Sequence, residues 1–74
     1  MARQYHSLLL NSGTPEAPAW GVEFGDYSKR TVEDERAEYR RDYPAKALRI
    51  VTTGDKQADI AAEVARLNDW RATA

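Results

Sequence analysis

The chain has 74 residues, a length that supports one hydrophobic core, so residues 1–74 are expected to form a single small domain. Eleven Lys and Arg residues against twelve Asp and Glu give a net charge of -1, which excludes a global field that would gather nucleic acid. The absence of cysteine excludes disulfides, thiol catalysis and thiolate metal sites. The single histidine, His6, makes a metal site unfavourable, and we expect no cofactor.

The composition is that of a soluble globular protein, with 42% hydrophobic and 31% charged residues. The longest apolar run, Leu8 to Leu10, is far too short to cross a bilayer. The first residues lack the apolar segment that a secretory signal needs. We therefore expect a cytoplasmic protein without a membrane partner.

The first predicted strand is Gln4 to Asn11, which ends in an Asn-Ser-Gly turn cluster. Leu8 and Leu10 would share one face of this strand and Leu9 the other, so both faces carry apolar side chains. A strand of this kind is typical of the centre of a sheet. Residues 12–19, with Pro15 and Pro18, show no periodicity and indicate a loop between antiparallel strands.

The second predicted strand begins at Trp20. Trp20, Val22 and Phe24 alternate with small or charged residues, which is the period of a strand with one buried face. We therefore expect these three side chains to point to the same side of the sheet. A third strand is predicted at Leu48 to Thr53, with Leu48 and Ile50 inward.

Two helices are predicted, one on each side of the third strand along the chain. The first spans Lys29 to Asp42, with Ser28 or Thr31 as its N-cap and Pro44 ending it. The second spans Asp55 to Trp70. The inward residues of the two helices are Val32, Tyr39 and Tyr43 in the first, and Ile60, Val64 and Leu67 in the second.

These elements predict an α+β fold in the order ββαβα. The crossover between the second and third strands is right-handed by rule, and the two-sided first strand belongs in the middle. We expect a three-stranded antiparallel sheet in the order 2-1-3, with both helices packed on one face. The pattern leaves open whether Trp20 and Trp70 are core or interface residues.

A sheet with both helices on one face leaves its other face uncovered. An uncovered apolar face of this kind indicates a protein partner or a homodimer. The residues expected on this face, and therefore predicted to bind protein, are Tyr5, Leu9, Glu23, Arg49 and Val51.

An alternative interpretation is a small RNA- or DNA-binding domain. Basic residues gather in the first helix and before the third strand, near two tyrosines, and phosphate contact combined with base stacking is how small domains hold single strands. The candidate residues for nucleic acid are Lys29, Arg30, Arg40, Arg41 and Lys46.

No motif in the sequence indicates an enzyme. His6 has no partner at a catalytic spacing, and Gly21 and Gly25 lie inside a strand pattern rather than in a phosphate-binding loop. We expect no catalytic residues, and favour a non-enzymatic protein-binding module.

The segment Trp20-Gly-Val-Glu-Phe-Gly-Asp-Tyr27, the Val-Glu-Asp-Glu start of the first helix and Leu48-Arg-Ile-Val-Thr-Thr53 resemble uncharacterised short proteins encoded by phages and prophages. The resemblance implies a small accessory protein that inhibits or modulates a host or defence enzyme. The strand-helix-strand portion is also similar to half of a SPOR-type peptidoglycan-binding domain, without the second half that completes that sheet.

Overall fold

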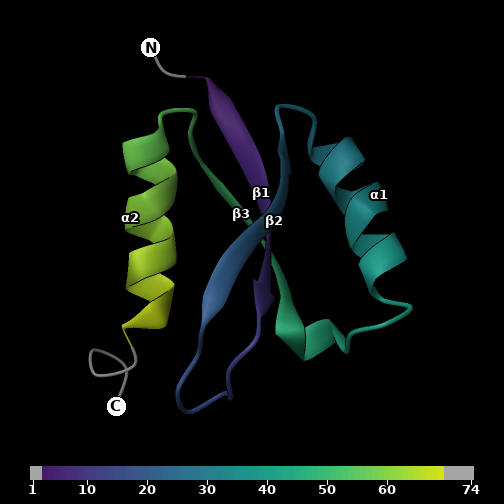
Figure 1. The fold of residues 1–74 in the computed structure, drawn as a ribbon. Helices are drawn as coiled ribbons and strands as arrows, with labels where there is room; N and C mark the ends of the chain where they lie inside the picture. Colours follow the sequence, from purple (N-terminus) through teal and green to yellow (C-terminus); the bar gives the residue numbers. More distant parts are fainter. Residues whose placement is uncertain (1–2, 70–74) are drawn as a thin grey trace.

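The computed structural model describes residues 3–69 and contains the elements expected of an α+β fold (Figure 1). They are, in chain order, β1 (Gln4–Asn11), β2 (Trp20–Asp26), α1 (Lys29–Tyr39), the 3-10 helix η1 (Ala45–Ala47), β3 (Leu48–Gly54) and α2 (Gln57–Asn68). The three strands are antiparallel in the order β2-β1-β3, so the predicted fold class and strand order are confirmed.

The predicted strands agree closely with the observed ones, whereas both helices are shorter than predicted. The first helix ends at Tyr39, and the residues between Tyr39 and Pro44 form turns. The second begins at Gln57, and Trp70 lies outside the described residues.

α1 packs on the β1 face that carries Leu8. Its N-cap is Ser28, whose hydroxyl accepts a hydrogen bond from the Thr31 amide at 3.3 Å. Val32 on the next turn is fully buried. The core on this side consists of Leu8, Val32 and Leu48, with Leu10, Phe24, Tyr39 and Ile50 packed around them.

α2 covers the opposite face of the sheet, so the expectation that both helices share one face is wrong (Figure 1). Leu9 is 0% exposed and Val51 8%, although both point away from α1. The reason is that β1 is apolar on both faces, and each face needs a cover. Leu9 and Val51 are therefore core residues rather than an open protein-binding or dimer surface.

The other three residues predicted on that open face have different surroundings. Tyr5 is half-buried and packs edge-on against Tyr27, with ring centroids 5.0 Å apart. Arg49 is exposed. Glu23 is exposed at a β-bulge, because Leu8 pairs with Phe24 whereas Leu9 pairs with Val22.

Because of the bulge, the apolar side chains of β2 do not all point to the one face of the sheet that their alternation had predicted. Each residue inserted into a strand moves the following side chains to the other face of the sheet. Phe24 consequently lies on the α1 face with Leu8, whereas Val22 and Trp20 lie on the α2 face with Leu9 and Asn11.

The Ser7 hydroxyl is buried on the α2 face. Ser7 is 0% exposed, and its Oγ finds no hydrogen-bond partner within the described residues. A buried polar atom without a partner carries an uncompensated desolvation cost of about 1 to 3 kcal/mol. Ser7→Ala is therefore expected to raise the free energy of unfolding by about 1 kcal/mol in urea melts. A loss of stability instead would mean that the hydroxyl is hydrogen-bonded in solution.

A candidate anion-binding groove

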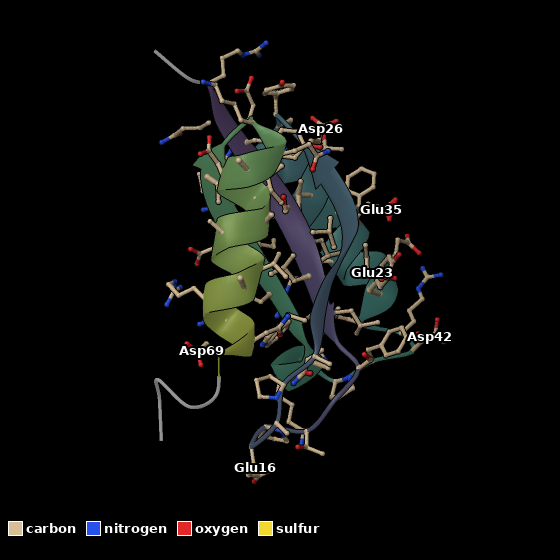
Figure 2. The ribbon with its side chains drawn as sticks, turned by 60° about the vertical axis from the view of Figure 1, so that its left-hand side comes forward. Glu16, Glu23, Asp26, Glu35, Asp42 and Asp69 are labelled. Atoms are coloured by element: carbon tan, nitrogen blue, oxygen red, sulfur yellow. The ribbon has the colours of Figure 1, made fainter. Side chains whose placement is uncertain are left out.

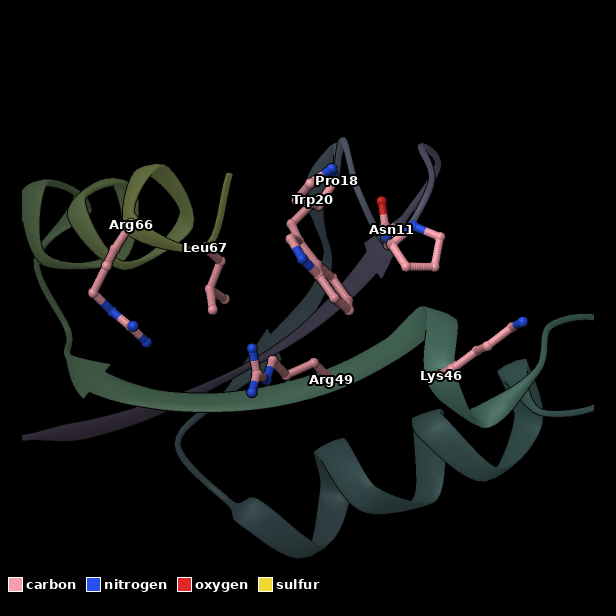
Figure 3. A pocket seen from close by; sticks show the side chains of 8 residues that line it. Asn11, Pro18, Trp20, Lys46, Arg49, Arg66 and Leu67 are labelled. Carbon is pink, nitrogen blue, oxygen red and sulfur yellow. The ribbon is translucent and has the colours of Figure 1, made fainter. Parts of the chain in front are cut away.

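A groove with a cavity volume of about 570 Å³ lies on the α2 face, where α2 ends over the sheet (Figure 3). It receives side chains from the β1–β2 loop, from all three strands or their ends, and from the last turn of α2. Its lining residues are Asn11, Pro15, Pro18, Trp20, Lys46, Arg49, Arg66 and Leu67.

Trp20 is fixed in this groove through its backbone. The Trp20 amide donates to Asn68 Oδ1 at 2.6 Å, and Asn68 Nδ2 donates to the Trp20 carbonyl at 3.1 Å. Asn68 is the last residue of α2, so this pair of hydrogen bonds ties the helix end to the start of β2. The indole points toward β3, which carries Arg49 (Figure 3).

The proline-containing loop is held by the Asn11 side chain. Asn11 Oδ1 accepts from the Gly13 amide at 2.9 Å and from the Ala19 amide at 2.8 Å. Gly13 suits this tight turn, because a Cβ there would clash with the Ala17 carbonyl oxygen. The loop therefore presents Pro15 and Pro18 as a defined apolar wall.

Three cationic side chains line the groove together with this apolar wall, and none of the lining residues is acidic. The Arg49 guanidinium lies over the Trp20 ring, 6.0 Å from its centroid. Arg66 pairs with Glu63 one turn earlier on α2. The hydrogen bond between them lowers the pKa of Glu63 and raises that of Arg66. In residues 3–69 neither Lys46 nor Arg49 has a salt-bridge partner.

The chemistry of this groove suits an anionic ligand that also carries apolar groups. Trp20, the prolines and Leu67 offer apolar contact, and the cations attract negative charge. Figure 2 shows Glu23, Glu35 and Asp42 on the side of the molecule where α1 lies, whereas Glu16 lies at the β1–β2 loop and Asp69 follows α2.

The residues predicted for nucleic-acid binding do not form one surface. Lys29 and Arg30 begin α1, whereas Arg40 and Arg41 follow its end, about 16 Å away for a helix of this length. Arg41 also pairs with Glu38 at 3.4 Å. Of the predicted set, Lys46 alone lies in the groove.

A second groove, of about 440 Å³, lies between β2 and the end of α1. Tyr39 and Tyr43 stack there with ring centroids 6.1 Å apart. Burial and the nearby Glu23 raise the pKa of the Tyr39 phenol. The lining residues are Glu23, Glu38, Tyr39, Arg41, Asp42 and Tyr43, so this groove is mainly acidic.

His6 is 8% exposed and its Nδ1 lies 2.8 Å from Thr52 Oγ1, a hydrogen bond between neighbouring strands. Across residues 3–69, no group of three or more His, Cys, Asp or Glu side chains is placed to hold a metal ion. No helix in that range is long and apolar enough to cross a membrane.

The Tyr27 hydroxyl links the β2–α1 and β3–α2 connections by donating to Asp55 Oδ2 at 3.0 Å. This hydrogen bond to a carboxylate raises the pKa of the Tyr27 phenol above its ordinary value. The contribution of this hydrogen bond to the free energy of unfolding is fully present below the ordinary tyrosine pKa. It is lost as the pH rises through the raised pKa that Tyr27 has in the folded state. We expect Asp55→Asn to lower the pKa of Tyr27, as measured by carbon NMR of labelled tyrosine. An unchanged pKa would contradict the assigned cause.

Comparison of the chain with protein-family models, with curated proteins and with solved structures finds no match.

The residues of the groove that sequence reasoning missed are mostly contributed by α2 and the loop. The sequence pattern places Leu67 in a helix on the other face of the sheet and Pro15 and Pro18 in a loop, and it gives no indication of a role for Arg66. The sequence of β1 could have indicated this groove, because its apolar side chains on both faces require a helix on each face of the sheet.

Proposed function

We propose that the chain is a non-enzymatic protein-binding module that holds an acidic segment of a partner protein in the groove around Trp20. The observation that carries this proposal is the combination of three cations in the lining of an apolar groove, of which only Arg66 is paired with a carboxylate, that of Glu63. This local charge is opposite to the net charge of the whole chain, which is -1. The positive groove is thus a specific feature of one surface.

The arrangement of the groove is suited to binding without large rearrangement. Arg49 already lies over the Trp20 ring, and Trp20 is hydrogen-bonded to α2 through its backbone. Side chains that are ordered before binding lose less conformational entropy when the partner arrives. Trp and Arg are also the residues that most often dominate the energetics of protein interfaces.

The resemblance to small phage accessory proteins implies that the partner is a host or defence enzyme, which this chain would inhibit or modulate. We propose that the two proteins meet in the cytoplasm, because a chain without cysteine is compatible with that reducing compartment.

A single-stranded nucleic acid is the second candidate ligand, favoured by an aromatic ring among cations. The position of Arg49 argues against it, because a guanidinium over the Trp20 ring occupies a face on which a base would stack. The salt dependence of such binding would be steep, because each phosphate contact releases counterions.

Calorimetric titration at low and high salt tests the proposal. The ligands are a short Glu-rich peptide with interspersed Val, its Lys-containing counterpart and a single-stranded oligothymidylate. We expect the acidic peptide alone to bind. Binding of the oligonucleotide but not of the acidic peptide would establish the second candidate, and binding of the Lys-containing peptide would contradict the role of the cations.

Glu63→Gln is expected to strengthen binding of the acidic peptide, by about twofold to fivefold. Glu63 is the intramolecular partner of Arg66, so its neutralisation releases that guanidinium for the ligand. Glu38→Gln is the matched control, because Glu38 of α1 forms the equivalent pair with Arg41, which follows the helix end. Titration of both variants should show a gain for Glu63→Gln only; an equal gain in both would indicate a general charge effect.

A further inference from the structure

We infer that the acidic segment binds as an extended strand added to the outer edge of β3, with acidic and apolar side chains alternating along it. This inference rests on the proposed function, since it uses the same cations: Arg49 lies on β3 and lines the groove, whereas Trp20 lies on β2, the opposite edge strand. It is carried by the shape of the molecule, the difference between the two edge strands and the position of the cations.

The molecule is a slab whose thinnest dimension is the width of the sheet. Its principal extents are 34, 30 and 13 Å. Three strands span two interstrand spacings, about 10 Å, so among residues 3–69 the thin dimension leaves no room for another element outside an edge strand. Figure 1 views the slab along this direction, with the strands overlapping between α2 and α1. Within the described residues, β1 is the only strand neighbour of β2 and of β3.

The two edges differ in how well they can accept another strand. β2 is interrupted by the bulge opposite Leu8 and Leu9 and carries the exposed Glu23 there. A bulge and an exposed charge are devices that prevent edge pairing. β3 pairs with β1 in unbroken register from Leu48 to Gly54, so its edge is regular over seven residues.

The positive charges beside β3 favour an acidic strand as the ligand of this edge. Lys46 lies in η1 immediately before the strand, and Arg49 is exposed on it, with Arg66 of α2 lining the same groove. Two copies of the chain paired antiparallel over the length of β3 would place Arg49 opposite Thr53, so a second copy would leave Arg49 without an acidic partner on that strand. An acidic strand from another protein is attracted instead.

The two faces of β3 determine which side chains of the added strand are acidic and which are apolar. Arg49 points to the α2 face, whereas the half-buried Ile50 points to the α1 face against its apolar core. Side chains of an added strand alternate in the same way. The inferred ligand therefore places acidic residues over the α2 face and apolar residues over the α1 face, which is a Glu-Val-Glu-Val type of pattern.

The test uses peptides as long as β3, seven residues. One alternates Glu and Val, and a second has the same composition with all Glu first. Two further peptides are N-methylated, one at the Glu nitrogens and the other at the Val nitrogens. In a strand, alternate amides point to opposite edges, so one of the two methylated sets removes the hydrogen bonds to β3 and the other leaves them intact.

We expect the alternating peptide to bind at least about tenfold more tightly than the segregated one, and one N-methylated peptide to lose about tenfold while the other binds as the parent does. Hydrogen exchange should slow at every second amide of β3 in the complex.

Equal affinities of the two N-methylated peptides overturn the inference, yet leave the proposed function standing if the acidic peptides still bind. Failure of every acidic peptide to bind overturns both. A β3-paired dimer in sedimentation, or preference for an oligonucleotide, assigns the edge to another occupant and overturns the inference.

Discussion

Leu9→Ala is expected to lower the free energy of unfolding by about 2 to 5 kcal/mol, the loss typical of removing a buried leucine and leaving a cavity. Leu9 is fully buried between β1 and α2, on the face that the sequence pattern had left uncovered. A domain of this size has a stability near the low end of 5 to 15 kcal/mol, so a large part of the population should unfold at moderate urea concentrations.

Val22→Ala is the matched control for this prediction. Val22 pairs with Leu9 across the same face but is 47% exposed, so its truncation should change stability by less than about 1 kcal/mol. Urea melts of both variants give the comparison. If Leu9→Ala changes stability as little as Val22→Ala, α2 does not cover this face in solution.

Removing two of the groove cations together, by Lys46→Ala with Arg49→Ala, is expected to weaken binding of the acidic peptide by at least about tenfold. Both side chains line the groove, and in the described part of the chain neither forms a salt bridge whose loss would destabilise the fold. Calorimetric titration of the variant gives the affinity, and a urea melt confirms that it is folded.

Lys29→Ala with Arg30→Ala is the control, because it changes the net charge by the same amount at the start of α1. An equal loss of affinity in both double variants would show that the peptide responds to overall charge rather than to the groove. A loss confined to the α1 variant would move the binding site to that helix.

The local features of the fold could be predicted from the sequence because they depend on neighbouring residues. The alternation in Leu48 to Thr53, the Ser28 cap and the apolar faces of β1 give the strands, α1 and the central place of β1 directly. The same residues yield the strand order, because a strand with two apolar faces is most stable in the middle.

The facing of β2 and α2 depended on features that alternation does not show. Trp20, Val22 and Phe24 retain perfect alternation, yet one bulge places Phe24 opposite to the other two. Which face α2 covers is set by where uncovered apolar area remains after α1 has packed, a property of the assembled sheet. The groove is formed by residues from three strands, a loop and α2. The residue pattern of any one of these elements therefore could not predict it.

Amide and indole NMR spectra, recorded while the alternating Glu-Val peptide is added, test the binding groove most directly. The Trp20 indole signal is distinguished from that of Trp70 by the Trp70→Phe variant. We predict that the largest shifts occur at the Trp20 indole, at Arg49 and along β3, with little change at the end of α1. Shifts centred on Tyr39 and Tyr43, or no shifts at saturating peptide, would contradict an acidic segment bound in the Trp20 groove.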